Sequence, residues 1–176
     1  MKKLTPTGVK LLEPPSYIND LMGSIYRLLL KDEPIKEEFK NGSINEIFSI
    51  ATYPQLGNFL LEYFKSIHET WCGQSLIPAQ IYGVRSYLNG SYLDLHVDTK
   101  STHHVSSIWT FEYDLNEEEE WSLQIYNHEN IELNLFLKPN TVLFYESSIC
   151  RHGRPTPFKG KFYRNLYMHY TLKDVK

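Results

Sequence analysis

Two segments in the first half of the chain carry apolar residues at the spacing of an amphipathic helix. In Ser16–Lys31 and Pro54–Thr70, apolar side chains recur three and four residues apart, which places them on one side of a helix. Ser16 is a suitable N-cap for the first helix, and Gly73 stands where the second should end. We interpret both stripes as core positions that pack against a sheet. Their members are Ile18, Leu21, Met22, Ile25, Leu28 and Leu29, then Leu56, Phe59, Leu60, Tyr63, Phe64 and Ile67.

The second half of the chain changes from helical spacing to short runs that are typical of strands. From Ala79 onward, these runs alternate with turn signals such as Asn89-Gly90 and Pro139-Asn140. One earlier short strand is predicted at Val9–Leu12. The later strands are predicted at Gln80–Leu88, Tyr92–Val97, His104–Tyr113, Trp121–Tyr126, Leu133–Leu137, Thr141–Glu146 and Phe162–Leu172.

This order of elements predicts a mainly β fold with flanking helices, in the α+β class. Many short strands that follow helices indicate a sandwich or barrel with helices packed on one face. The 176 residues fit one domain. Within it, we expect residues 1–75 to form a helical support and residues 76–176 to form the β core.

Composition and charge narrow the class of protein. A net charge of −3 gives no general attraction to nucleic acid or to an anionic membrane, so neither is an expected partner. No stretch approaches the ~20 apolar residues of a membrane helix, and no apolar run follows the basic start of the chain. We expect a soluble cytoplasmic protein, with Cys72 and Cys150 as free buried thiols. The sequence does not give the oligomeric state.

Three residues of the β half have the pattern of a metal site. His96 and Asp98 are two positions apart, so on an extended strand their side chains project to the same face. His152, from a distant strand, can complete one triangular face of an octahedron. Two histidines and one carboxylate form the facial triad of non-heme Fe(II) oxygenases, which leaves three positions open for a bidentate co-substrate and O₂. Catalytic zinc usually keeps one open position.

A basic residue near the end of the chain fits the same chemistry. The distal carboxylate of 2-oxoglutarate needs a cation in a dry pocket, usually an Arg or Lys on the last strand. Lys159 precedes Gly160 and is expected in a turn, whereas Lys161 and Arg164 have opposite strand parity. Lys161 shares its face with polar residues, and Arg164 shares its face with apolar ones. Parity favours Lys161 but leaves Arg164 open.

The order of these parts resembles a known family, the prolyl 4-hydroxylase-like branch of the 2-oxoglutarate/Fe(II) dioxygenases. The likeness extends from Tyr82 to about Tyr170 and is strongest around the two segments with metal-ligand candidates. It implies a double-stranded β-helix (a jelly roll, as in cupins) with N-terminal helices on the major sheet. The segments that carry it are Tyr87-Leu88-Asn89-Gly90, His96-Val97-Asp98, His152-Gly153-Arg154-Pro155 and Gly160-Lys161-Phe162-Tyr163.

The resemblance also implies cofactors and residue roles. The two histidines and the aspartate would bind Fe(II), and 2-oxoglutarate and O₂ would be co-substrates. Lys161 matches the family's lysine that pairs with the distal carboxylate of 2-oxoglutarate. Tyr87 matches a tyrosine that helps to bind this co-substrate, and Asn165 and Tyr167 fall where family members line the pocket.

Other polar residues near these segments have less certain roles. Arg85 is expected in a structural ion pair, and Arg151 and Arg154 are expected at a solvated rim. Whether these arginines or Arg164 contact a substrate stays open. His169 shares the strand parity of Lys161 and is a candidate to orient a metal ligand.

The expected function is the hydroxylation of a substrate C–H bond. The resemblance implies a peptidyl proline as the substrate, and a small molecule such as a free amino acid is the alternative within the same class. A second alternative is a non-catalytic, cupin-like metal-binding protein, which would share the fold but would not need a lysine for a second carboxylate.

Overall fold

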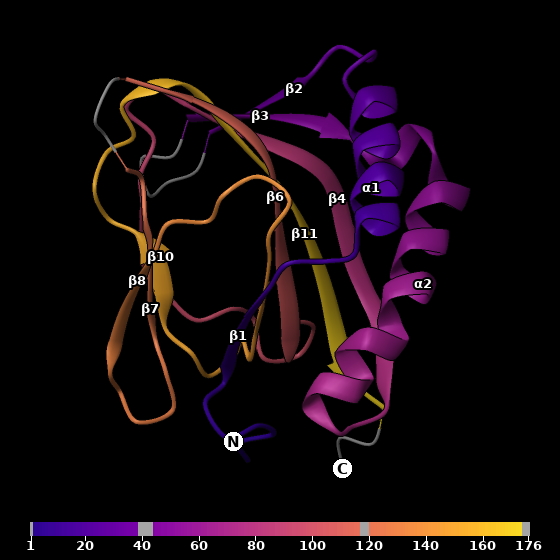
Figure 1. Cartoon of the computed structure of the whole chain (residues 1–176), viewed down its shortest axis with the longest axis vertical. Helices are drawn as coiled ribbons and strands as arrows, with labels where there is room; N and C mark the ends of the chain where they lie inside the picture. Colours follow the sequence, from indigo (N-terminus) through magenta and orange to yellow (C-terminus); the bar gives the residue numbers. More distant parts are fainter. Residues whose placement is uncertain (1, 39–43, 117–119, 174–176) are drawn as a thin grey trace.

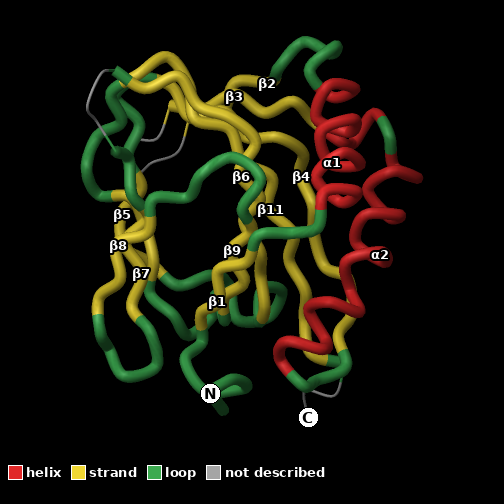
Figure 2. The backbone as a smooth tube through the Cα atoms, viewed as in Figure 1, coloured by secondary structure: helices red, strands yellow, loops and turns green. Residues whose placement is uncertain are grey.

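The computed structural model describes residues 2–38, 44–116 and 120–173. Two antiparallel sheets face each other, and both α-helices lie on the far side of the larger sheet (Figure 1). The chain thus forms three layers in the order small sheet, large sheet and helices. The N- and C-terminal ends lie at the same end of the molecule (Figure 2).

The larger sheet has seven strands, all paired antiparallel, and draws on both halves of the chain. In spatial order, its strands are β1 (Val9–Leu12), β9 (Val142–Tyr145), β6 (Val105–Leu115), β11 (Gly160–Leu172), β4 (Leu76–Leu88), β3 (Ile44–Ser49) and β2 (Ile35–Glu38). Residues 1–75 therefore contribute three strands to this sheet besides the helices. Among these three, only β1 is predicted from the sequence.

The smaller sheet has four antiparallel strands. In spatial order they are β5 (Leu93–His96), β10 (His152–Arg154), β7 (Leu123–Tyr126) and β8 (Glu132–Leu135). Within this sheet, β10 lies between β5 and β7, and His152 is paired with His96. The register of this short pairing brings the two predicted histidine ligands to adjacent strands.

Both predicted helices are present, with small differences at their ends. Helix α1 spans Ser16–Leu29 and helix α2 spans Pro54–Cys72, after a single 3₁₀ turn, η1, at Ile50–Thr52. The prediction of Ser16 as an N-cap is wrong, because Pro15 occupies that position and no side chain caps the helix. Gly73 ends α2 as predicted, with a left-handed φ of 65° and its N–H donated to Glu69 O.

One hydrophobic cluster joins the helices to the larger sheet. It includes Met22 and Leu29 from α1, Leu60 and Phe64 from α2, and Trp109 from β6. The apolar stripe of α1 is buried as predicted, with its remaining members at least partly covered. The stripe of α2 is only half buried, and its exposed members are Phe59, Tyr63 and Ile67.

Separate clusters fill the space between the two sheets. One of them combines Ile108 and Tyr145 of the larger sheet with Leu123 and Ile125 of the smaller sheet. Alternate residues of β6 and β9 thus face the helices and the smaller sheet in turn, as the period of a strand requires. This arrangement places the polar cavity described below between the sheets.

Two further sequence expectations concern the cysteines and the membrane. Cys72 and Cys150 are buried free thiols, as predicted. Within the described ranges, no helix has both the length and the apolar composition needed to cross a bilayer.

Candidate metal centre and active site

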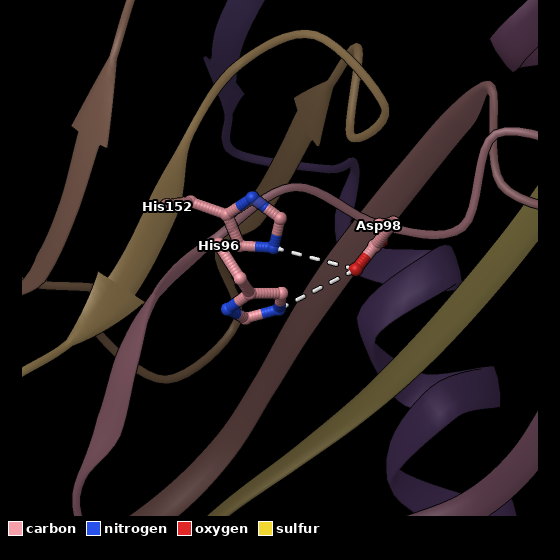
Figure 3. A group of neighbouring side chains, drawn as sticks. All are labelled: His96, Asp98 and His152. Atoms are coloured by element: carbon pink, nitrogen blue, oxygen red, sulfur yellow. Dashed lines mark ion pairs between the residues drawn. The ribbon is translucent and has the colours of Figure 1, made fainter. Parts of the chain in front are cut away.

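His96, Asp98 and His152 converge between the two sheets (Figure 3). One ligand atom from each residue lies within 4.8 Å of the others. The Nε2 atoms of His96 and His152 lie 3.5 and 3.7 Å from Asp98 Oδ1. The structure thus brings together all three residues that the sequence pattern predicts as metal ligands.

The backbone positions of the three residues are set by strand β5, by the loop that follows it and by strand β10. Strand β5 ends at His96, and Asp98 lies in the following loop rather than on the strand itself. The N–H of Asp98 donates to Ser147 O at 2.9 Å, which ties this loop to the end of β9. Gly153, next to His152, lies so close to β5 that a Cβ atom would come within 2.6 Å of Leu93 O. The glycine therefore permits the close approach of the two ligand-bearing strands.

Both imidazoles turn the same ring nitrogen toward Asp98. His96 Nδ1 lies 2.8 Å from Asp94 O, and His152 Nδ1 lies 2.9 Å from Cys150 O. Because a carbonyl oxygen only accepts, Nδ1 carries the proton and Nε2 of a neutral ring keeps a free lone pair. Two such nitrogens and a carboxylate oxygen repel one another unless a cation lies between them. The donor set therefore fits a metal ion.

The protonation states of the site also favour the binding of a metal ion. Burial alone raises the pKa of Asp98, but a hydrogen bond from His96 in its protonated form and the charge of the nearby imidazoles outweigh it and lower that pKa to about 2. The same hydrogen bond raises the pKa of His96. Burial lowers the pKa of His152 to about 4. Near neutral pH, the site thus offers a carboxylate and an uncharged imidazole at these positions, the forms in which both groups bind metals.

A second layer of polar residues surrounds Asp98. Its Oδ2 atom is buried without a hydrogen bond in the described part of the chain, and His169 Nδ1 lies 3.9 Å away. His169 is held by Ser106 Oγ at 2.7 Å, and His103 packs on its ring at a centroid distance of 4.0 Å. His169 therefore lies beside the aspartate without a hydrogen bond to it, and its role in orienting a metal ligand stays a prediction.

A cavity of about 340 Å³ opens beside the three ligands. Its wall includes apolar and aromatic groups from both sheets and two cations, Arg85 and Arg154. Ile108, Leu123 and Tyr145 supply the apolar part of the lining. A cavity of this kind can hold a small polar molecule next to a bound metal while limiting its contact with water.

Tyr87 and Tyr167 line the cavity, whereas Asn165, which the resemblance also places in the pocket, does not. The two tyrosine hydroxyls line the cavity and form a hydrogen bond with each other at 2.9 Å. Asn165 is buried on the same face of β11, but its amide oxygen accepts from Thr110 Oγ1 and it does not line the cavity.

Lys161 does not reach this cavity, so the prediction that it faces the pocket is wrong. Its side chain is 79% exposed and forms an ion pair with Asp114 at 2.9 Å. The ladder between β11 and β6 is irregular between Gly160 and Phe162, at the first residues of the strand. Strand parity, which correctly places Tyr163 and Tyr167 inside, therefore fails at Lys161.

The prediction that Arg154 lies at a solvated rim is wrong, because Arg154 is a buried cation of this cavity. It is 1% exposed, and its guanidinium lies 4.4 Å from the ring centre of Trp121 and 4.5 Å from that of Tyr163. Nη1 donates to Trp121 O, whereas Nη2 is buried without a hydrogen-bond partner among the described residues. Arg154 is two positions after His152 and lines the same cavity, but β10 has only three residues and its pairing with β5 is irregular between them, so no strand pattern marks Arg154 in the sequence.

The other arginines have structural partners. Arg85 forms the expected ion pair, with Glu37 at 3.3 Å. Arg164 faces α1 and pairs with Glu112 at 2.6 Å, so it is not the cation of the cavity. Arg151 is exposed and lies over the ring of Tyr126, in agreement with a rim position. Tyr145, packed edge-on against His152, carried no recognisable sequence signal because it ends an apolar strand.

Solved structures with the same arrangement of elements place this site in context. An oxidoreductase of the 2OG-Fe(II) oxygenase family from Burkholderia pseudomallei superposes with a TM-score of 0.74 at 12% identity, over 93% of this chain and 85% of that one. This chain has the fold of the 2-oxoglutarate/Fe(II) oxygenases. No family model matches the sequence, and no curated protein matches it.

Two other structures of the same fold contain ligands. HygX from Streptomyces hygroscopicus, with nickel, 2-oxoglutarate and hygromycin B bound, has a TM-score of 0.66 at 12% identity, covering 97% of this chain and 85% of its own. A prolyl hydroxylase from Trichoplax adhaerens, in complex with a hypoxia inducible factor oxygen degradation domain peptide fragment, has a TM-score of 0.67 at 12% identity, covering 96% and 85%. At these identities, the likeness establishes the oxygenase fold of this chain.

Proposed function

We propose that the protein is an Fe(II)- and 2-oxoglutarate-dependent dioxygenase that hydroxylates a C–H bond of its substrate. The observation that carries the proposal is the set of facing donor atoms on His96, Asp98 and His152, next to a cavity with a buried cation. Two imidazoles and one carboxylate on one side of a metal leave the opposite side open. The non-catalytic alternative does not explain why a cation is buried beside these donors.

Bound Fe(II) would be held by these three residues and would supply the O₂ activation that couples decarboxylation of 2-oxoglutarate to substrate oxidation. The chain's own contribution is to position the reactants. Ile108, Leu123 and Tyr145 keep one side of the cavity apolar, which limits the access of water to the reacting groups. The hydrogen-bonded pair of Tyr87 and Tyr167 offers hydroxyl groups to a bound oxygen ligand.

Arg154, rather than Lys161, would bind the distal carboxylate of 2-oxoglutarate. Its Nη2 donor, which has no partner in the described part of the chain, and its burial favour a charge-assisted hydrogen bond, which is strongest away from water. Trp121 and Tyr163 hold the guanidinium in place through their ring faces. Arg85 is the weaker candidate because Glu37 already balances its charge.

A peptidyl proline is the substrate that we propose. The resemblance to prolyl 4-hydroxylases supports this choice, and the prolyl hydroxylase from Trichoplax adhaerens shares the fold with a peptide bound. HygX, which has hygromycin B bound, shows that the fold also accommodates small molecules. A small molecule such as a free amino acid is therefore the alternative that an experiment must address.

The proposed activity is tested by succinate formation. Protein loaded anaerobically with Fe(II) is mixed with 2-oxoglutarate and air, and succinate is measured with and without candidate substrates. We expect slow succinate formation without substrate, and none without Fe(II) or with Asp98→Ala. Wild-type protein that binds Fe(II) but forms no succinate under any condition would contradict the proposal.

The substrate class is tested separately. Proline-rich peptides and a panel of free amino acids are incubated with the active protein, and mass spectrometry detects the gain of one oxygen atom. Oxygen gain on a peptide proline supports the peptide substrate. Oxygen gain on free amino acids, with unmodified peptides, favours the small-molecule alternative.

A further inference from the structure

A second cavity lies on the opposite face of the larger sheet from the metal site. Its volume is about 530 Å³, larger than that of the metal-site cavity. It is enclosed by the connection from β1 into α1, by one side of α2, and by residues of β6, β9 and β11. Nothing in the proposed oxygenase reaction uses this space.

Buried His68 on α2 offers a hydrogen-bond acceptor to this cavity. His68 lines the cavity and is fully buried, and its Nδ1 lies 2.7 Å from Phe64 O on the same helix. Since a carbonyl oxygen only accepts, Nδ1 must donate and Nε2 must carry the lone pair. Nε2 is buried with no hydrogen-bond partner among the described residues. Leaving such an atom unpaired costs free energy, typically about 1–3 kcal/mol.

Trp109 on β6 offers the complementary donor. It also lines the cavity and is 1% exposed, and its Nε1–H is buried without an acceptor in the described part of the chain. An indole N–H can only donate. The residues that line the cavity therefore include one buried acceptor and one buried donor, beside apolar side chains such as Phe144 and Met168 and the polar residues Glu13 and Ser66.

The charges and the entrance of the cavity limit what can bind. Glu13 is the only acid or Lys/Arg among the described residues that line it, and burial lowers the pKa of His68 to about 4, so the imidazole is uncharged near neutral pH. A carboxylate or phosphate would find no cation to balance its charge. Tyr17, Tyr63 and Ile67 are exposed apolar residues that also line the cavity. An apolar molecule can therefore enter from solvent along an apolar surface.

We propose that this cavity is a binding site for a neutral, largely apolar molecule with a hydroxyl group, such as a phenol or an apolar alcohol. A hydroxyl group can donate to His68 Nε2 and accept from Trp109 Nε1–H, so one group can serve both buried atoms. The apolar body would fill the space lined by Phe64, Phe144 and Met168. The half-exposed stripe of α2, which the sequence pattern assigns to the core, would be part of the entrance.

The site is separate from the metal centre but shares its strands. Trp109 and Phe144 face the helices, while their neighbours Ile108 and Tyr145 line the metal-site cavity. Binding on the helix side can therefore be measured in the metal-free protein. The proposal does not depend on the oxygenase activity.

Two matched probes test the hydrogen bonds without any mutation. The first is 2-naphthol, a neutral phenol, and the second is 2-methoxynaphthalene, which can accept but cannot donate. Calorimetry gives the affinities, and the indole N–H signals in nitrogen-15 NMR spectra locate the site, with Trp109→Phe used to assign the signal of Trp109. A third probe, 2-naphthoate, tests the exclusion of anions.

We expect 2-naphthol to bind saturably and to shift the Trp109 signal, and 2-methoxynaphthalene to bind about tenfold more weakly. In His68→Phe, the affinity for 2-naphthol should fall to the affinity that the wild-type protein has for 2-methoxynaphthalene. If that variant does not fold, the comparison of the two neutral probes on the wild-type protein still tests the proposed hydrogen bonds. Equal affinities of the two neutral probes, tighter binding of 2-naphthoate, no saturable binding, or a response at another tryptophan alone would each overturn the proposal.

Discussion

The buried guanidinium of Arg154 packs against the rings of Trp121 and Tyr163, and its Nη2 atom has no hydrogen-bond partner among the described residues. A full charge in such a position is costly unless a partner of opposite charge binds there. Lys161, in contrast, is solvated and already paired with Asp114. Burial and pairing, rather than position on the last strand, thus distinguish a binding cation from a surface one.

The roles of these two residues give the first prediction. Arg154→Gln should raise the KM for 2-oxoglutarate in the succinate assay by about 10- to 100-fold, because a charge-assisted hydrogen bond is lost. Lys161→Gln removes the same charge from the surface and should change this KM by less than about twofold. A larger effect of Lys161→Gln than of Arg154→Gln would contradict the assignment.

His68 gives a prediction on pH dependence. Its pKa is about 4 in the folded protein, because of burial, and 6.5 is its ordinary value. The unfolded chain therefore binds more protons between these values, so this residue's contribution to stability is full above pH 6.5 and is lost as the pH falls toward 4. His152 and His169 shift in the same direction, so a variant is needed to isolate His68.

The measurement compares urea unfolding of wild-type protein and His68→Phe at pH 7 and pH 5. The wild type should lose about 2 kcal/mol more unfolding free energy over this interval than the variant. Equal losses in the two proteins would show that His68 is not buried in its neutral form.

The direction in which a side chain points could be predicted from the sequence where its strand is regular. The inward side of Tyr163 and Tyr167 follows from a period of two, whereas Asp98 lies in the loop after β5, so its approach to His96 does not. The position of Lys161 could not be predicted, because it depends on a local irregularity between β11 and β6. His152 and Arg154 line the same cavity, but β10 is not among the predicted strands, so this rule did not identify the buried cation.

Most of the elements could be predicted, including strands of only four residues such as β1, β5 and β9. Helices α1 and α2 begin at the predicted residues, and the longer strands β4, β6 and β11 lie where the pattern places them. Strand β10 has three residues, too few to show a period, yet it carries His152. Strands β2 and β3 were missed because polar and charged residues interrupt their apolar pattern.

The close pairing of β10 with β5 predicts that a side chain at Gly153 disturbs the metal site. In Gly153→Ala, the added Cβ would meet Leu93 O at 2.6 Å and Asp94 O at 2.7 Å, so the two strands must separate. We expect a loss of about 1–3 kcal/mol of unfolding free energy and weaker Fe(II) binding, because His96 and His152 move apart.

Gly73→Ala is the matched control for this change. Gly73 ends α2 with a positive φ, and a Cβ atom there would meet nothing within 4 Å. This variant should lose about 1 kcal/mol of stability through backbone strain but keep its affinity for Fe(II). Unchanged Fe(II) affinity in Gly153→Ala, measured by calorimetry, would contradict the role given to the strand contact.

For the whole molecule, the sequence predicted the class of fold but not its assembly. The change from helical to strand period indicates helices against a β core, which is what the layers show. The order of seven strands from both halves depends on long-range pairing, which leaves no mark on local periodicity. The site is a product of that assembly, because its ligands come from strands that meet only in the folded chain.

Anaerobic calorimetric titration of Fe(II) into the protein tests the account most directly, with Asp98→Ala and the neighbouring His103→Ala as variants. The account predicts one Fe(II) per chain for the wild type and for His103→Ala, since His103 is not among the converging ligands. It also predicts a large loss of affinity for Fe(II) in Asp98→Ala. A wild-type protein without saturable Fe(II) binding, or an Asp98→Ala variant that binds Fe(II) as the wild type does, would contradict it.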